Sequence, residues 1–149
     1  MGDFLPAPRL YLKVISPENE YLPSQYDKNC VAYTGTHDND TLYSFINSME
    51  ASERKAFTQT LETECLLADV PYISETVEDE CESVVRLLFS SKANTVIIPM
   101  QDILCMDTEA RLNASATVSA RNWTFRFIEK DFKRRKAAWL SEMAKEYKR

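Results

Sequence analysis

Residues 30–41 read CVAYTGTHDNDT, and this stretch decides how the rest of the sequence is interpreted. Residues 30–34 form a short run of buried-type residues, which predicts a strand that ends directly before the polar residues. A short helix is expected from residue 42 to about residue 49, with Asp40 or Thr41 as its N-cap. The polar residues of this stretch are therefore expected at the carboxyl end of a strand.

A second strand is predicted at residues 95–99, TVIIP. A short, continuous run of β-branched residues is typical of a strand that is covered on both faces of a parallel sheet. Gln101 and Asp102 follow directly after this strand, and residues 9–15 form a third candidate strand. Polar residues at the carboxyl ends of strands are typical of the active sites of α/β barrels and open parallel sheets.

Three longer helices are predicted at residues 52–67, 76–90 and 129–147. Ser52 is a candidate N-cap for the first, and Thr76 with Asp79 forms a capping-box-like start for the second. The apolar stripe of the second helix consists of Val77, Cys81, Val84, Val85, Leu88 and Phe89. The residues expected to face inward in the first helix are Ala56, Thr60, Leu61 and Cys65. The residues expected to face inward in the last helix are Phe132, Trp139, Leu140, Met143 and Tyr147. Many Lys and Arg residues of that helix are expected to face outward.

The chain has 149 residues, enough for one domain but short of the ~250 that a complete (β/α)₈ barrel needs. We expect an irregular leader at residues 1–10 and one α/β domain at residues 11–149. The net charge of -5 argues against a nucleic-acid or membrane partner, and the sequence has neither a membrane-span pattern nor a signal-peptide pattern. A cytoplasmic protein whose four cysteines stay reduced is therefore expected.

Residues 36–40, THDND, leave three interpretations open when they are taken alone. They can cap the following helix, form a cluster of active-site carboxylates, or bind a metal ion. The metal interpretation is weakened because His37 is the only histidine in the chain. A calcium loop of the EF-hand type counted from Asp38 would need glycine and glutamate where Tyr43 and Met49 stand. No metal and no cofactor is expected.

Residues 33–41, YTGTHDNDT, resemble the signature of the 4-α-glucanotransferases of glycoside hydrolase family 77. Four further segments resemble other landmarks of that family in the same order along the chain. They are residues 21–23 (YLP), 98–104 (IPMQDIL), 111–113 (RLN) and 122–126 (NWTFR). The resemblance covers about residues 11–149 and corresponds only to the C-terminal part of the family.

The resemblance implies a retaining transglycosylase that acts on α-1,4-glucans or maltooligosaccharides. Such an enzyme needs a nucleophile and a general acid/base about 5 Å apart. Asp38 matches a third carboxylate that stabilises the transition state, and His37 matches a neighbour that binds the same sugar. Asn39, Gln101 and Asn113 are expected to bind substrate.

The family fold is a (β/α)₈ barrel, and this chain would supply about its last three βα units with a C-terminal helix. Strands at 11–15, 31–34 and 95–99 would then be the sixth, seventh and eighth. The nucleophile and the acid/base would lie on earlier strands, so the isolated chain is expected to be inactive. The competing interpretation is a non-catalytic remnant or carbohydrate-interaction module.

Several positions depart from the family pattern. Ser115 and Ala116 stand where Pro-Gly is usual, and Cys105 stands where glycine is usual. Phe125 replaces a tryptophan, and residues 44–45 replace Gly-Trp. The change at Ala116 affects the shape of the loop on the acceptor side, because glycine permits backbone conformations that alanine resists.

Two further expectations concern surfaces. A three-stranded part of a barrel has open edges, so residues 96–98 should need self-association or an upstream barrel fragment to cover them. The alternating aromatic residues at 123, 125 and 127 are expected to pack beneath the last helix, and the basic residues at 130–136 to form a solvated face.

Overall fold

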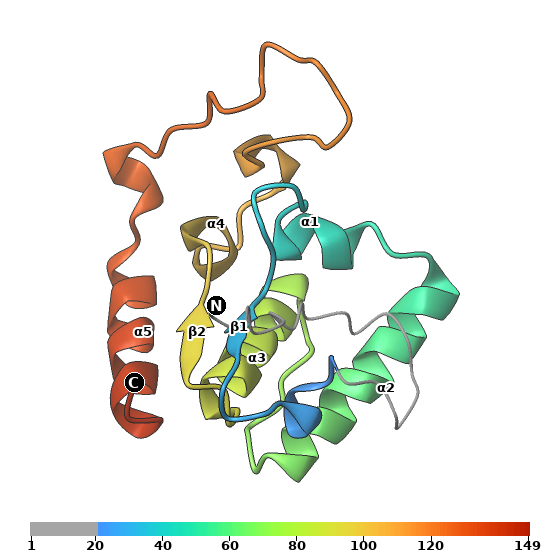
Figure 1. Ribbon diagram of the computed structural model, residues 1–149, viewed down its shortest axis with the longest axis vertical. Helices are drawn as coiled ribbons and strands as arrows, with labels where there is room; N and C mark the ends of the chain where they lie inside the picture. Colours follow the sequence, from blue (N-terminus) through green and yellow to red (C-terminus); the bar gives the residue numbers. More distant parts are fainter. Residues whose placement is uncertain (1–20) are drawn as a thin grey trace, which may run out of the picture.

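The structure is a computed structural model that describes residues 21–149 (Figure 1). The predicted leader at 1–10 and the predicted strand at 9–15 lie outside the described residues. Strand β1 (Val31–Tyr33) pairs in parallel with strand β2 (Thr95–Ile97), with Ala32 opposite Val96. The positions of both strands follow the predictions at 30–34 and 95–99. Within residues 21–149, these two strands form the sheet.

Three helices lie between the two strands in the sequence, and the first of them is short. Helix α1 (Leu42–Asn47) begins as predicted, because the Thr41 side chain accepts a hydrogen bond from the Ser44 backbone N–H. Helix α2 (Ala51–Leu67) does not have the predicted cap at Ser52. Its N-cap is Glu50, whose backbone is extended and whose side chain makes no capping bond. Ser52 therefore lies inside the first turn.

Helix α3 (Val77–Ser90) is the centre of the packing. Thr76 and Asp79 form the predicted capping box, in which each side chain bonds to the other residue's backbone N–H. The helix packs against α1, α2, α5 (Arg134–Glu146) and α4 (Met100–Ile103). The side chains with no exposed surface around it are Ile46, Leu61, Cys65, Cys81, Val84 and Leu88. The predicted apolar stripe is therefore the face around which the described helices assemble.

The inward face of α2 differs from the prediction at three positions, and the first is Ala56, which is only partly buried. Phe57 and Glu64 are buried, in addition to the predicted Thr60, Leu61 and Cys65. The Glu64 carboxylate accepts hydrogen bonds from the backbone N–H and the hydroxyl of Ser24, both at 2.9 Å. A buried acid is tolerated at this position because these bonds replace its hydration.

Strand β2 is not covered on both faces, so this prediction is wrong for the described part of the chain. Val96 and Ile98 pack against the cluster that contains Leu88 of α3. Successive strand residues point to opposite faces, so Ile97 points away from that cluster, and 57% of its surface is exposed.

The helix predicted at 129–147 is interrupted. Glu129–Asp131 forms a separate 3₁₀ turn, and Phe132 has an extended backbone before α5 begins. Phe132 is 54% exposed, so its predicted inward orientation is wrong. Met143 is buried as expected, and the residues that pack beside it against the same cluster are Trp139, Leu140 and Tyr147. Lys136 is also buried, although the basic residues of this helix were expected to face outward.

The C-terminal ends of α2, α4 and α5 share one backbone feature. Each is followed by a residue in the left-handed region, namely Asp69 (φ 54°), Cys105 (φ 51°) and Lys148 (φ 55°). Glycine usually occupies this position, because it has no Cβ. The whole chain contains two glycines, so other residues adopt the conformation here. Among residues 21–149, no helix has the length and apolar character that crossing a bilayer requires.

Candidate functional site

The loop at residues 34–41 is fixed at both ends by one buried carboxylate. The Thr34 hydroxyl donates a hydrogen bond to Oδ2 of Asp102, and the Leu42 backbone N–H donates to Oδ1 at 2.8 Å. Asp102 belongs to α4, directly after β2, and is 3% exposed. Burial raises its pKa, and the hydrogen bonds from Leu42 and Thr34 oppose that rise. The carboxyl ends of the two strands therefore meet, as the sequence predicts.

Inside this loop, two polar side chains hold the turn. Oδ1 of Asn39 accepts hydrogen bonds from the backbone N–H (2.8 Å) and the hydroxyl (2.9 Å) of Thr36. Oδ1 of Asp40 accepts from the Thr41 N–H, and its Oδ2 accepts from the hydroxyls of Ser44 and Thr108. Of the two predicted N-caps, Thr41 is therefore the one that caps α1, and Asp40 holds the start of the helix through Thr41 and Ser44.

Gly35 has a steric role at the start of the same loop. A Cβ atom added at this position would lie 3.3 Å from the Cβ of Asn39. This distance is tighter than an ordinary van der Waals contact, so the absence of a side chain lets the Asn39 turn close.

His37 and Asp38 remain at the surface of the loop. Their side chains are 52% and 48% exposed, and Nε2 of His37 lies 3.3 Å from Oδ2 of Asp38. The Trp123 ring lies against His37, with 5.1 Å between the ring centroids and 40° between the planes. Trp123 is 55% exposed, so the prediction that it packs beneath the last helix is wrong.

Residues 111–115 form a second loop that contacts Asp38. The Asn113 side-chain amide donates to Oδ1 of Asp38 at 2.6 Å. The backbone carbonyl of Asp38 accepts from the Arg111 guanidinium at 2.8 Å and from the Ser115 hydroxyl at 3.1 Å. These bonds join segments that are more than 70 residues apart, and together they hold both the backbone and the carboxylate of Asp38.

The next residue in this loop explains one departure noted in the sequence. Ala116 has a φ of 58°, in the left-handed region that favours glycine. The loop thus keeps the conformation for which the resemblance predicts glycine, and the alanine side chain makes that conformation less favourable.

Gln101 lies behind the two loops rather than on their surface. It is 8% exposed, and its side-chain amide donates to the carbonyl of Ala110 at 3.3 Å. It also lines a small cavity of about 80 Å³ between residues 35–41, 99–102 and 110–112. The structure therefore brings His37, Asp38 and Asn113 together, while Asn39 and Gln101 hold the loops that surround them.

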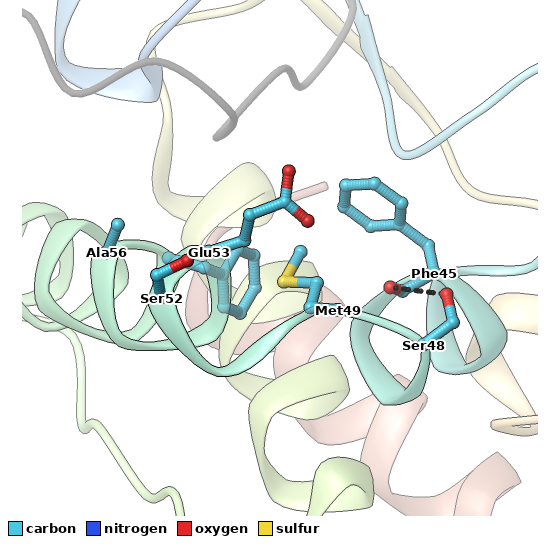
Figure 2. Close-up of a pocket in the computed structure, with 7 residues that line it drawn as sticks. Phe45, Ser48, Met49, Ser52, Glu53 and Ala56 are labelled. Atoms are coloured by element: carbon cyan, nitrogen blue, oxygen red, sulfur yellow. Dashed lines mark hydrogen bonds between the residues drawn. The ribbon is translucent and has the colours of Figure 1, made fainter.

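A larger hollow, with a volume of about 420 Å³, lies between α1 and the start of α2. Figure 2 shows the residues that line it. The side chains of Phe45, Met49 and Glu53 surround its opening, and Phe57 is among its lining residues. Among residues 21–149, Glu53 is the one charged residue that lines it, and none of residues 34–41 does. We therefore take the surface around Asp38, not this hollow, as the candidate site.

Three of the contacts described above were not predicted from sequence. Arg111 and Ser115 bind the backbone of Asp38, and Trp123 packs against His37. Residues 111–113 and 122–126 stood out only as separate segments of a resemblance. Side chains of the types that hold metal ions do not gather in groups of three or more anywhere in residues 21–149.

Comparison with known proteins gives a consistent result. The family model described as 4-alpha-glucanotransferase, of glycoside hydrolase family 77, matches residues 10–131. The chain belongs to this family. A 4-alpha-glucanotransferase of Clostridium butyricum is 42% identical over 109 residues, which cover 72% of this chain and 20% of that protein. The chloroplastic enzyme of Arabidopsis thaliana is 37% identical over 110 residues, 73% of this chain and 17% of that protein.

A solved structure gives the same assignment to the 4-α-glucanotransferase family. An amylomaltase from Streptococcus agalactiae, in complex with acarbose, superposes with a TM-score of 0.71 and 27% sequence identity. The match covers 89% of this chain and 24% of that chain. The chain thus spans about a fifth of the length of the relatives it matches.

Proposed function

We propose that this chain supplies the transition-state-stabilising part of a 4-α-glucanotransferase that transfers α-1,4-glucan segments between maltooligosaccharides. The observation that carries the proposal is the bond between Asn113 and Asp38, because it unites two segments of the family pattern around one half-exposed carboxylate. The site also lies at the carboxyl ends of parallel strands, where barrel enzymes bind their substrates.

In this proposal Asp38 and His37 act on the sugar that is transferred. The Asp38 carboxylate accepts hydrogen bonds from ring hydroxyls and stabilises the positive charge of an oxocarbenium-like transition state. His37 orients the same sugar. Asn113, Arg111 and Ser115 hold Asp38 in advance, so little reorganisation accompanies the reaction. Asn39 and Gln101 contribute by shaping the loops around the sugar.

The nucleophile and the general acid/base of the proposed retaining mechanism come from earlier barrel strands. Asp40 and Asp102 line the cavity beside the site, but each is already bonded to backbone and hydroxyl groups. Neither is therefore suited to attack a sugar or to protonate a leaving group. The chain would form the last three βα units of the barrel. We expect an upstream barrel segment or a second copy of the chain to cover Ile97.

The test is a chimera in which this chain replaces the matching part of the C. butyricum enzyme. We expect the chimera to convert maltotriose to glucose and longer oligomers, and the 149-residue chain alone to show no turnover. The unmodified C. butyricum enzyme is the positive control. A chimera that folds and binds maltooligosaccharides without turnover would favour a non-catalytic carbohydrate-binding module instead. Turnover by the isolated chain would contradict the proposed division of catalytic groups.

A further inference from the structure

A second group of reactive side chains lies outside the candidate site, where three helices meet. Cys81 on α3 has no exposed surface, and Cys105 after α4 is half-buried. Lys136 on α5 is 2% exposed, and its ammonium donates to Sγ of Cys105 at 3.2 Å and to Oε1 of Glu82 at 2.7 Å. A buried lysine is unfavourable without such partners. The Cys105 sulfur is one of the two groups that accept hydrogen bonds from the Lys136 ammonium.

The surroundings of Cys105 favour its thiolate. A hydrogen bond from Cys81 and the charge of Lys136 lower the pKa of Cys105 to about 7, although burial and Glu78 act in the opposite direction. The hydrogen bond to Cys105, burial and the charge of Asp102 raise the pKa of Cys81, so Cys81 keeps its proton while Cys105 is a thiolate. Oxidation of Cys105 removes the first of these causes and makes Cys81 easier to deprotonate. Glu82 also faces this cluster and pairs with Lys136 at 2.7 Å. Arg135 lies 3.7 Å from both Glu82 and Glu78.

The two remaining cysteines provide a contrast within the same chain. Burial raises the pKa of Cys65 on α2 to about 11 and also raises the pKa of Cys30 before β1. Neither bonds to a cation among the described contacts. Since the thiolate is the nucleophilic form, Cys105 should react far faster than these two thiols at neutral pH.

We propose that Cys105 is a site of oxidation by hydroperoxides and that Cys81 is its resolving thiol. In the first step the Cys105 thiolate attacks one peroxide oxygen, so that an S–O bond forms and the O–O bond breaks. The sulfur is oxidised by two electrons, and hydroxide leaves when the oxidant is hydrogen peroxide. In the second step the sulfur of Cys81 attacks the sulfenic acid, an S–S bond forms, and water leaves with the proton from Cys81.

The proposed disulfide would join α3 to the end of α4, the short helix that carries Gln101 and Asp102. Cys105 is half-buried and can meet a small oxidant, whereas Cys81 has no exposed surface. Cys105 packs against the apolar cluster that contains Cys81, so the two thiols lie in the same part of the fold. This proposal goes beyond glucan transfer and does not depend on it, because none of the groups involved contacts Asp38 or His37 in the described structure.

The experiment treats the reduced 149-residue chain with one equivalent of hydrogen peroxide at pH 7, blocks the remaining thiols and maps the peptides by mass spectrometry. We expect one intramolecular link, between Cys81 and Cys105. In Cys81→Ser the link should be lost, and a sulfenic acid at Cys105 should be trapped by dimedone. The serine hydroxyl can still donate to the thiolate. The matched control, Cys65→Ser, should behave like the unmodified chain. A link between two chains, or equal oxidation of Cys30 or Cys65, would overturn the proposal.

A second measurement tests the activation by Lys136. The rate of Cys105 alkylation by iodoacetamide should rise with pH with a midpoint near pH 7 in the unmodified chain. Lys136→Gln should slow alkylation at pH 7 roughly tenfold, because only a few per cent of an ordinary thiol is ionised there. If that variant fails to fold, the pH midpoint of Cys105 alkylation in the unmodified chain still tests the proposal. A midpoint at the ordinary thiol value of ~8.5 would contradict the proposal.

Discussion

Two regions of the molecule are stabilised in different ways. The helical core, which we define as α1, α2, α3 and α5 with their shared apolar cluster, is closed by side chains such as Leu61 and Val84 that have no exposed surface. The loop layer, defined as residues 34–41 and 105–128, extends beyond α1 and α4 (Figure 1). There Asp38 and His37 are about half exposed and are held by hydrogen bonds and ring contacts.

The helical core stabilises the fold, whereas the loop layer shapes the candidate site. Burial of apolar surface stabilises the helical core and does not depend on direction. The loop layer depends on a few directional bonds, and it contains three residues in the left-handed region, Cys105 (φ 51°), Ala116 (φ 58°) and Trp123 (φ 66°). Such strained positions are frequent where a loop is shaped for a ligand. Substitutions in the loop layer should therefore change the global free energy of unfolding only a little. The loss of a single polar group there should instead disturb the geometry of the site strongly.

The largest effect on stability is expected from α2, where one helix offers a buried and an exposed leucine. Leu61 has no exposed surface and Leu66 is 80% exposed. Leu61→Ala should lower the free energy of unfolding by about 2–5 kcal/mol, because it leaves a cavity. Leu66→Ala should change it by less than about 0.5 kcal/mol. Urea unfolding of both variants, followed by circular dichroism, measures the difference. Equal losses would show that the helical core is not closed as described.

Asp102 links the two regions, and its effect is expected to depend on pH. Its pKa is raised in the folded chain, so the ionised form is less favourable there than in the unfolded chain. The stability of the unmodified chain relative to Asp102→Asn should be greatest below the unfolded pKa of ~3.9 and should fall as pH rises through the folded pKa. A tenfold change in proton affinity corresponds to about 1.4 kcal/mol. Urea unfolding at several pH values tests this, and parallel profiles would contradict it.

The smallest effect is expected within the loop layer itself. Ala116→Gly should raise the free energy of unfolding by up to about 1 kcal/mol, because glycine adopts φ 58° without a Cβ penalty. Ala114 does not have a positive φ, so Ala114→Gly is the matched control and should lower stability by roughly 0.5–1 kcal/mol. Thermal unfolding of the two variants is the measurement. A loss in both would mean that Ala116 is not strained.

The helical core could be predicted largely from the sequence. The apolar stripe and capping box of α3 are local patterns, and they gave its position to within a residue. The break before α5 was missed, because it depends on Asp131 accepting a hydrogen bond from the Ile128 N–H and on the extended backbone of Phe132. The burial of Lys136 was missed because its partners, Glu82 and Cys105, lie on other elements.

The loop layer could be predicted only through family resemblance. Spacing alone left the residues around Asp38 open to capping, catalysis or metal binding. The bond from Asn113 to Asp38 joins positions 75 residues apart, and no periodic pattern encodes such a contact. Trp123 was predicted to pack beneath the last helix because aromatic residues alternate at 123, 125 and 127, yet it lies against His37. Burial follows a pattern in the sequence, whereas the meeting of two loops does not.

The most direct test of the account is the effect of Asp38→Asn in the active chimera. The asparagine keeps the size of the side chain and can still accept from Asn113, so the variant removes mainly the charge. We expect kcat with maltotriose to fall roughly 10²–10³-fold, while the Kd of the glucan changes far less. Asp107→Asn, a change at an exposed acid in the same loop layer, should leave both constants unchanged. An unchanged kcat with a raised KM would contradict the account, because Asp38 would then only bind substrate.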